Sequence, residues 1–292
     1  MKKLFLTGGS GFIGRNIIDQ LGSVYDISAP GHHELDLLNE DQVRSYLMAG
    51  RFDAVIHSAI KPGHRNAPDQ TGLLEANTRM FFNLARCRDS FGTMLFLGSG
   101  SVYDMRHYQP RMKEDYFDAH VPVDPVGYAK YLCAKYIETT DNIYDLRVFG
   151  IFGRYEDYAI RFISNAICKA LFDLPITCRQ NRVFSYLFID DLMPVLRFFI
   201  EKPPLRAYNI TPDETVELVH IAQKVLEVSG KDLPVLIAQE GMGIEYSGDN
   251  ARLRKAMPTG TMTPIDQAIR KLYDWYAEHR ESIDRSKLLI DK

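Results

Sequence analysis

Residues 7–14 read Thr7-Gly8-Gly9-Ser10-Gly11-Phe12-Ile13-Gly14. An apolar run precedes them and an amphipathic stretch follows, so we expect a strand, a tight turn and a helix. In such a unit the first glycine allows the turn, the second lets backbone approach a pyrophosphate, and the third lets the helix pack closely on the sheet. Free N–H groups at the helix start favour an anion. The residues expected at a dinucleotide cofactor are Gly8, Ser10, Gly11, Phe12, Ile13 and Gly14.

Short apolar runs alternate with longer amphipathic segments through the first half of the chain. The predicted strands are Lys3–Thr7, Val24–Ala29, Asp53–Ala59, Met94–Ser99 and Asp145–Phe149. The predicted helices are Ile13–Leu21, Asp41–Met48, Leu73–Arg88 and Tyr128–Thr139. Alternation of this kind is typical of a parallel sheet that is covered on both faces. The fold class is therefore α/β, with a Rossmann-type doubly wound parallel sheet.

The second half of the chain is less regular. Helices are expected over Tyr158–Phe172 and Pro264–Ala277, and a strand over Phe184–Ile189 that runs into a helix through Asp190 and Asp191. We predict a dinucleotide-binding domain over residues 1–152, rejoined by about residues 184–212. Residues 153–292 should form a smaller C-terminal α+β domain that binds the substrate.

The composition excludes several kinds of partner. The chain has 292 residues, 46% hydrophobic and 25% charged, with a formal net charge of −3. This balance gives no general attraction to polyanions, so nucleic acid is not an expected partner. The N-terminal apolar run breaks at Thr7-Gly8-Gly9, too early for a signal peptide, and no stretch could cross a bilayer. Four cysteines without C-x-x-C spacing suit free thiols, so we expect a cytoplasmic protein that no membrane holds.

The glycines follow the pattern G-x-x-G-x-x-G, and here the sequence resembles the extended branch of the short-chain dehydrogenase/reductase superfamily. Its members, the epimerase/dehydratase family, mostly act on nucleotide-linked sugars. Asp36-Leu37 resembles the pair that meets the adenine, and Ser58-Ala59 the strand end that passes along the cofactor. Residues 146–153 resemble the sixth strand and the turn beyond it. The resemblance covers nearly the whole chain and implies an NADP or NAD cofactor and a homodimer.

A candidate catalytic pair lies on the helix expected over residues 128–139. Tyr131 and Lys135 are four residues apart, which places them on one helix face about one turn apart. A nearby ammonium lowers the pKa of a phenol, and such a pair can run acid/base chemistry on a carbonyl or an alcohol. Tyr128 is a rival, but Leu132 stands four residues beyond it. We therefore predict Tyr131 as proton donor and Lys135 as its partner, the lysine also holding the nicotinamide ribose.

A hydroxyl is expected at the end of the strand over residues 94–99. Ligands of open α/β sheets bind outside the carboxyl ends of the strands. The resemblance of Val102-Tyr103 to the residues after the family's catalytic serine assigns Ser99 to that role, with Ser101 as the second candidate. Ser99 should hydrogen-bond the reacting oxygen, and Ser101 should contact the substrate.

Other polar residues are assigned to the substrate or to the core. Arg182 lies in a region that resembles the substrate-phosphate strand, and a guanidinium suits bidentate phosphate binding. We also expect Asn165 at the substrate. His57 is interpreted as a hydrogen-bonded core histidine. The pair His32-His33 lacks a third ligand at useful spacing, so no metal site is predicted.

Three reactions fit this resemblance: reduction of a keto-sugar, 4-epimerisation and 4,6-dehydration. Dehydratases carry an Asp-Glu pair after the catalytic hydroxyl, where this chain has Gly100-Ser101, so dehydration is not expected. The strand end around residues 97–99 resembles the GDP-fucose synthase and dTDP-4-dehydrorhamnose reductase groups. The former epimerises with a cysteine two residues after its serine, where Ser101 stands.

The first interpretation is therefore an NAD(P)H-dependent reductase of a nucleotide-linked 4-keto-6-deoxy sugar, made for cell-surface polysaccharide. Strand two ends without the carboxylate that would repel a 2′-phosphate, so NADPH is acceptable as well as NADH. An NAD-dependent 4-epimerase is the alternative. A dinucleotide-binding regulator without catalysis is a second alternative.

Overall fold

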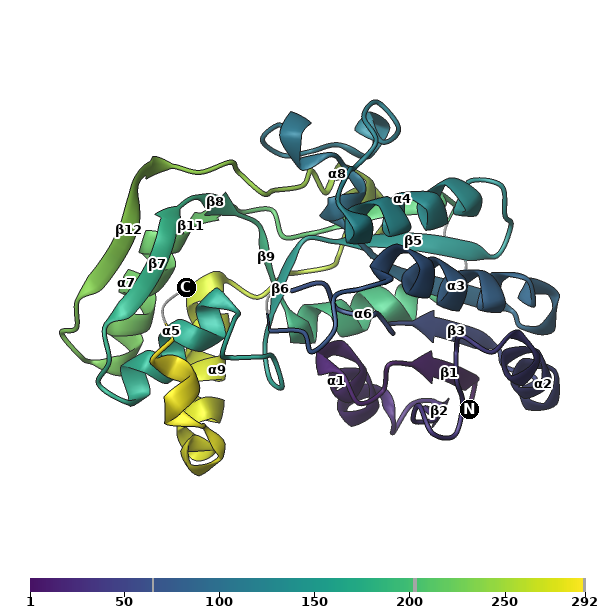
Figure 1. Cartoon of the computed structure of the whole chain (residues 1–292), viewed down its shortest axis with the longest axis horizontal. Helices are drawn as coiled ribbons and strands as arrows, with labels where there is room; N and C mark the ends of the chain where they lie inside the picture. Colours follow the sequence, from purple (N-terminus) through teal and green to yellow (C-terminus); the bar gives the residue numbers. More distant parts are fainter. Residues whose placement is uncertain (65, 202–203, 291–292) are drawn as a thin grey trace.

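A parallel six-stranded sheet forms the centre of the larger part of the molecule (Figure 1). The structure is a computed structural model that describes residues 1–64, 66–201 and 204–290. In spatial order the strands are β2 (Asp26–Ser28), β1 (Lys3–Thr7), β3 (Ala54–His57), β4 (Thr93–Ser99), β5 (Ile143–Val148) and β10 (Ala207–Ile210). Every neighbouring pair is parallel. The carboxyl ends of these strands form the edge at which sheets of this kind bind their ligands.

Helices cover both faces of this sheet. They are α1 (Phe12–Leu21), α2 (Glu40–Gly50), α3 (Leu73–Ala85), α4 (Pro125–Ile137) and α6 (Ile189–Phe199). On one face α1 and α6 share a hydrophobic core with Leu4 and Leu6 of β1. On the other face Phe5 joins a second core with α2, α3 and α4. Alternate residues of β1 thus enter opposite cores, as a doubly wound sheet requires, and the predicted fold class is confirmed.

A smaller mixed part follows and stands to the left in Figure 1. Its helices are α5 (Phe162–Leu171), α7 (Leu218–Ser229) and α9 (Ile265–Glu278), whereas α8 (Ala251–Ala256) lies against β10 of the large sheet. Its strands form three pairs: β7 (Ile176–Asn181) with β12 (Val235–Met242), β8 (Val183–Phe184) with β11 (Val216–Glu217), and β6 (Gly150–Phe152) with β9 (Tyr186–Phe188). The core of this part is continuous with that beneath α1 and α6. The predicted strand over 184–189 is thus two short strands that pair with different partners.

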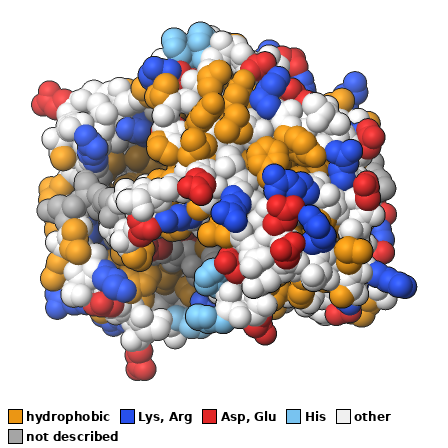
Figure 2. All heavy atoms as spheres, turned by 45° about the vertical axis from the view of Figure 1, so that its right-hand side comes forward, with side chains coloured by type: hydrophobic (Ala, Val, Ile, Leu, Met, Phe, Trp, Pro, Cys, Tyr) orange, Lys and Arg blue, Asp and Glu red, His pale blue; other side chains and the backbone are white. Residues whose placement is uncertain are grey.

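Short 3-10 turns complete the described structure. They are η1 (Arg88–Ser90), η2 (Gly100–Val102), η3 (Met105–His107), η4 (Glu114–Tyr116), η5 (Arg280–Ser282) and η6 (Arg285–Leu288). Among the described residues, no helix has the length and apolar character needed to span a membrane. On the face drawn in Figure 2, acidic and basic side chains are interspersed. That face therefore offers no continuous basic surface for a polyanion.

One helix begins earlier than the sequence suggested, and this matters for the site. The prediction started the helix at Tyr128, whereas α4 starts at Pro125. The Asp124 carboxylate accepts a hydrogen bond from Gly127 N at 2.7 Å, and Pro125 occupies the first turn, where its missing N–H costs nothing. Val126 therefore lies on the helix, four residues before Lys130.

Candidate active site

A cavity of about 860 Å³ lies between the carboxyl ends of the parallel strands and the smaller part of the molecule. Residues from the glycine turn, from β3 and β4, from α4 and from the α5–β8 region all contribute to its wall. This is the place where open α/β sheets bind their ligands. The volume lies within the usual range for ligand sites.

The glycine turn is folded tightly against the end of β3. Gly8 has a φ of +73°, and a Cβ there would lie 2.8 Å from Ala59 N. A Cβ on Gly14 would lie 2.1 Å from the carbonyl oxygen of Gly8. Only glycine fits both positions, the first because of its conformation and the second because of its close approach. The turn is thus as tight as its glycine spacing predicts.

Several predicted cofactor residues lie on the cavity wall, namely Gly11, Phe12, Ile13, Ser58 and Ala59. The Thr7 hydroxyl accepts hydrogen bonds from Ser58 N at 3.2 Å and from Ala59 N at 3.1 Å, which fixes the two loops to each other. Ser10 is exposed on the turn.

Asp36 and Leu37 do not contribute to the cavity wall. The Asp36 carboxylate accepts from Leu38 N at 2.9 Å, and Asn83 donates to the Leu37 carbonyl at 2.9 Å. These contacts hold the loop after β2, and the predicted adenine contact stays a prediction.

His57 is held within the core, as interpreted from the sequence. Its Nδ1 lies 2.8 Å from Thr7 Oγ1, and its ring stacks on Phe96. Burial, followed by the charge of Lys130, lowers the pKa of His57 to about 3. The imidazole is therefore neutral near pH 7 and adds no positive charge to the cavity.

The two predicted serines meet at the end of β4. Ser99 Oγ and Ser101 Oγ lie 2.5 Å apart, and Ser99 Oγ also accepts from Ser101 N at 3.1 Å. Both residues line the cavity. A substrate oxygen at this point would meet two hydroxyl groups.

Lys130 shares the cavity wall with these serines, and the sequence alone did not point to it. The side chains of α4 on the cavity wall are Val126, Ala129, Lys130 and Cys133. Lys130 Nζ donates to the Leu97 carbonyl at 2.9 Å and lies 5.2 Å from the centre of the Phe96 ring. Loss of hydration lowers the pKa of Lys130. The Lys130 amine is thus fixed within the cavity wall, against the strand that ends in Ser99.

The predicted catalytic pair lies on another face of α4. With 3.6 residues per turn, Tyr131 points roughly 140° and Lys135 roughly 180° away from Val126. Neither residue lines the cavity. The assignment of Tyr131 and Lys135 as the pair in the cavity is therefore corrected: their mutual spacing is right for such a pair, but the helix turns both away.

Tyr131 and Lys135 instead contact carboxylates outside the cavity. The Tyr131 hydroxyl donates to the Asp118 carboxylate. Lys135 Nζ lies 3.0 Å from Asp118 Oδ2 and 2.8 Å from Glu138 Oε2, with 39% of its side chain exposed. Burial, with Asp118 adding to it, raises the pKa of Tyr131 to about 12. Lys135 opposes this rise in the pKa of Tyr131, but its charge is shared by two carboxylates and its effect is smaller than those of burial and Asp118.

Replacing Tyr131 by phenylalanine should therefore leave turnover within about threefold of wild type. The change removes one hydrogen bond to a surface carboxylate, which costs about 1 kcal/mol of folding free energy. Steady-state turnover and a urea unfolding curve check the two effects. A loss of about 100-fold in turnover with unchanged stability would restore Tyr131 to the reaction.

The far end of the cavity carries positive charge from the smaller part of the molecule. The predicted Arg182 lies there, with its guanidinium carbon 6.0 Å from the centre of the Phe184 ring. Arg161 and Arg179 lie there too, and the sequence analysis missed both. Asn165 also lines this end, where its Nδ2 donates to the Tyr158 carbonyl at 2.9 Å. Guanidinium groups suit a diphosphate, so this end fits a nucleotide.

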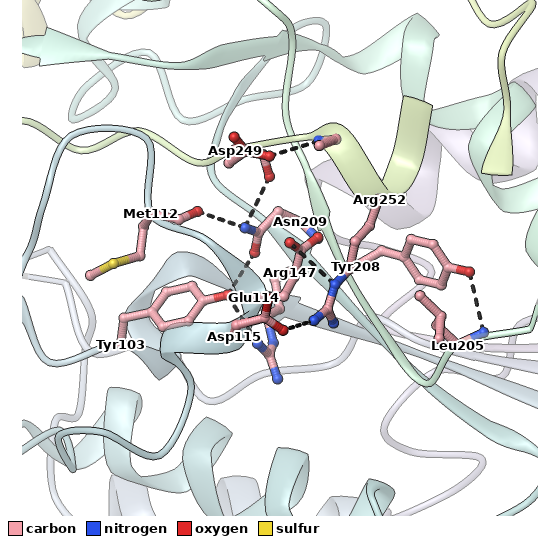
Figure 3. A network of polar contacts seen from close by, with 11 residues as sticks. Tyr103, Met112, Glu114, Asp115, Arg147, Leu205, Tyr208, Asn209, Asp249 and Arg252 are labelled. Carbon is pink, nitrogen blue, oxygen red and sulfur yellow. Dashed lines mark hydrogen bonds and ion pairs between the residues drawn. The ribbon is translucent and has the colours of Figure 1, made fainter. Parts of the chain in front are cut away.

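A buried polar network joins β5 and β10 to the segment after β4 (Figure 3). Arg147 Nε lies 2.6 Å from Asp145 Oδ2, and Arg147 Nη1 donates to the Tyr103 hydroxyl at 2.9 Å. That hydroxyl donates to Asn209 Oδ1 at 2.8 Å, and Asn209 N donates to Glu114 at 2.9 Å. The network thus ties the loop after Ser99 to β5 and β10.

Comparison with known proteins agrees with this geometry. Residues 4–211 match the model of the NAD dependent epimerase/dehydratase family. A GDP-L-fucose synthase of Azorhizobium caulinodans is 33% identical over 149 residues. The match covers 49% of this chain and 48% of that protein, so the chain spans about half the length of this relative.

Solved structures share the fold over nearly the whole chain. A GDP-L-fucose synthetase from Naegleria fowleri superimposes with a TM-score of 0.84 at 15% identity, covering 96% of this chain and 95% of that one. That synthetase has also been solved with NADP bound. A UDP-glucose 4-epimerase from Thermotoga maritima gives a TM-score of 0.82 at 16% identity, covering 95% and 99%. The sheet, the second part and their order are thus those of known sugar-nucleotide enzymes.

Proposed function

Because the chain belongs to the NAD dependent epimerase/dehydratase family, we propose that it reduces the C4 ketone of a nucleotide-linked 4-keto-6-deoxy sugar with NAD(P)H. Members of this family are NAD(P)-dependent epimerases, dehydratases and reductases of sugar nucleotides. One observation carries the proposal: a single cavity joins the glycine turn, then Ser99 and Lys130, then the three arginines. A dinucleotide and a nucleotide sugar can therefore meet end to end at the serine.

The residues present divide the work between binding and chemistry. When bound, the nicotinamide supplies a hydride. The glycine turn and the start of α1 hold the pyrophosphate through backbone N–H groups. Lys130 replaces Lys135 as the lysine that holds the nicotinamide ribose. Ser99 donates a hydrogen bond to the carbonyl oxygen, and Arg182 with its neighbours binds the diphosphate of the substrate.

Simple reduction is favoured over combined epimerisation because Ser101 stands where a cysteine acid would act. The test measures NADPH and NADH oxidation with a panel of GDP-, dTDP-, CDP- and UDP-linked 4-keto-6-deoxy sugars, run in deuterated water. Turnover with no deuterium on carbon supports reduction. Deuterium at C3 or C5 would show epimerisation. In a separate arm with 4-hydroxy sugar nucleotides such as UDP-glucose, interconversion of C4 epimers without net change of NAD(P)⁺ or NAD(P)H would show a 4-epimerase.

NADPH is expected to be accepted at least as well as NADH. Residues 29–31 after β2 are Ala29-Pro30-Gly31, with no carboxylate to repel a 2′-phosphate. The next acid, Glu34, accepts a hydrogen bond from Gly31 N at 2.7 Å. The check is kcat/KM for each cofactor at saturating keto-sugar. A preference for NADH of about tenfold or more, worth about 1.4 kcal/mol, would contradict this prediction.

A second candidate function is cofactor binding without catalysis. The observation that favours it is Val126, an apolar side chain four residues before Lys130. A regulator of this kind would bind NADP⁺ or NADPH in a fluorescence titration. It would reduce no member of the same panel.

A further inference from the structure

The cavity lacks a proton donor four residues before Lys130, which is the position that the Y-x-x-x-K pattern gives to the tyrosine. The tyrosine-lysine pair of the resemblance has its tyrosine four residues before the lysine. Four residues before Lys130 stands Val126, which lines the cavity. A hydrocarbon side chain cannot give a proton to an alkoxide. If the chain reduces a ketone, the proton comes from another group.

A different tyrosine reaches Ser99 from the smaller part of the molecule. Tyr246 lines the cavity, and its phenol interacts with the hydroxyl groups of Ser99 and Tyr108. Its ring lies 5.3 Å from that of Tyr108, in a stacked arrangement, and 5.2 Å from that of Phe149. The oxygen that Ser99 would hold therefore lies within reach of a second hydroxyl, that of Tyr246.

Other acids of the cavity fit the role less well. His57 gives its Nδ1 to the contact with Thr7 and is neutral near pH 7. Tyr186 packs against Phe152 and Phe184, with ring centres 6.0 and 5.0 Å away, on the side of the smaller part. Lys130 already donates to the Leu97 carbonyl. Tyr246 is thus the phenol that the structure brings to Ser99.

Backbone contacts hold Tyr246 in this position. Tyr246 N donates to the Val183 carbonyl at 2.9 Å, and Ser185 N donates to the Tyr246 carbonyl at 3.1 Å. The next residue, Ser247, accepts at its carbonyl from Met112 N at 3.0 Å. The backbone at Tyr246 is therefore fixed on both sides, which helps to position its side chain.

The buried network extends this support (Figure 3). Asn209 Nδ2 donates to the carbonyls of Met112 at 2.8 Å and Asp249 at 3.1 Å. Asp249 N donates to the Met112 carbonyl at 2.8 Å. Because the loop after Ser99 and the segment after Tyr246 bind the same amide, the serine and the tyrosine are held as one unit.

We propose that Tyr246 is the proton donor of the reduction, in place of the tyrosine that is missing at Val126. This inference rests on the proposed function. As the hydride adds to the carbonyl carbon, the C=O π pair moves to oxygen and takes the proton from the Tyr246 hydroxyl. The phenolate that remains is reprotonated by water. The sum is one ketone, one NAD(P)H and one proton giving one alcohol and one NAD(P)⁺.

The protonation state of Tyr246 suits this role. Loss of hydration raises the pKa of Tyr246 to about 12, while the contacts with Ser99 and Tyr108 act in the opposite direction. The phenol therefore carries its proton across the neutral range, before the hydride moves. Because an alkoxide is a stronger base than a phenolate, the transfer is downhill.

The test compares Tyr246→Phe with wild type on the keto-sugar that wild type reduces. We expect kcat to fall about 100-fold or more, while the Kd for NADPH changes less than about threefold. Val126→Tyr, added to Tyr246→Phe, should recover at least tenfold of the loss, because it returns a phenol to the helix position. Val126→Phe in the same background is the matched control without a hydroxyl and should recover nothing. Wild-type kcat in Tyr246→Phe overturns the inference.

A binding measurement separates this inference from the proposed function. If wild type reduces no keto-sugar, the reductase proposal fails on its own. Calorimetric titration with GDP-mannose and UDP-glucose in the presence of NADP⁺ then compares the same two proteins. Weaker binding of either ligand to Tyr246→Phe, by about fivefold or more (about 1 kcal/mol), supports contact between the phenol and the sugar. Equal affinities for both ligands overturn it.

Discussion

Replacing Lys130 by methionine is expected to lower turnover by about 100-fold or more and to weaken NADPH binding. Lys130 lies on the cavity face of α4, and its Nζ is 2.9 Å from the carbonyl oxygen of Leu97 in the strand that ends in Ser99. Methionine has a similar length and no charge, and it packs readily against Phe96. The fold should therefore survive, and the loss should report on the missing ammonium.

Lys135→Met is the matched control for this change. Lys135 sits on the same helix but pairs with Asp118 and Glu138 at the surface. Exposed pairs of this kind contribute about 0–1 kcal/mol, so Lys135→Met should keep turnover and NADPH affinity within about threefold. Turnover is measured with the keto-sugar of the wild type, and NADPH affinity by fluorescence titration. The reverse order, with Lys135→Met inactive and Lys130→Met active, would contradict the assignment of the site.

The second large effect is on stability. Arg147→Met should lower the free energy of unfolding by about 3–5 kcal/mol, because it leaves the Asp145 carboxylate buried without its partner. Arg147 and Asp145 have side chains only 2% and 1% exposed and lie 2.6 Å apart. Burial already raises the pKa of Asp145, with Arg147 opposing that rise. Removal of the guanidinium would drive the carboxyl group toward its protonated form.

Urea unfolding of two further variants checks this reading. The double variant Asp145→Leu with Arg147→Met should be more stable than Arg147→Met alone, since no uncompensated charge remains. Arg206→Met removes an arginine whose partner Asp141 is fully exposed and should cost less than about 1 kcal/mol. If Arg147→Met were as stable as Arg206→Met, the buried pair would have no structural role.

The sequence predicted the sheet and the glycine turn because both depend on local patterns. A five-residue apolar strand, a turn with fixed glycine spacing and an amphipathic helix follow one another within residues 3–21. A Cβ at Gly8 would collide with Ala59, and a Cβ at Gly14 would collide with the carbonyl oxygen of Gly8. Both positions therefore need the glycines that the spacing predicts. The end of β4 at Ser99 followed from the same kind of pattern.

The helix register was missed for a physical reason. Lys130 and Lys135 are five residues apart, so they point roughly 140° away from each other on a helix. The Y-x-x-x-K spacing alone could not say which lysine faces the sheet edge. Asp124-Pro125 is a local signal for the start of a helix, and it places the start of α4 three residues before Tyr128. The Asp124 side chain caps this start by accepting a hydrogen bond from Gly127 N. That signal, taken together with Val126, could have identified Lys130.

Tyr246 could not be found from local patterns. It lies in an irregular segment after β12, and its position depends on backbone bonds to Val183 and Ser185 and on the amide of Asn209 nearby. These partners are far apart in sequence, and none of them belongs to a local motif that would mark it. Only their arrangement in space brings this phenol to Ser99.

The proposed reaction is the transfer of a hydride to C4 of a nucleotide-linked sugar. The most direct measurement is a single turnover with NADPH carrying deuterium at its transferable position, followed by mass spectrometry and NMR of the product. We expect one deuterium, bound to C4 of the sugar, for wild type and for Lys135→Met. A product without deuterium at C4, or the absence of any product across the panel while NADPH binds, would contradict it.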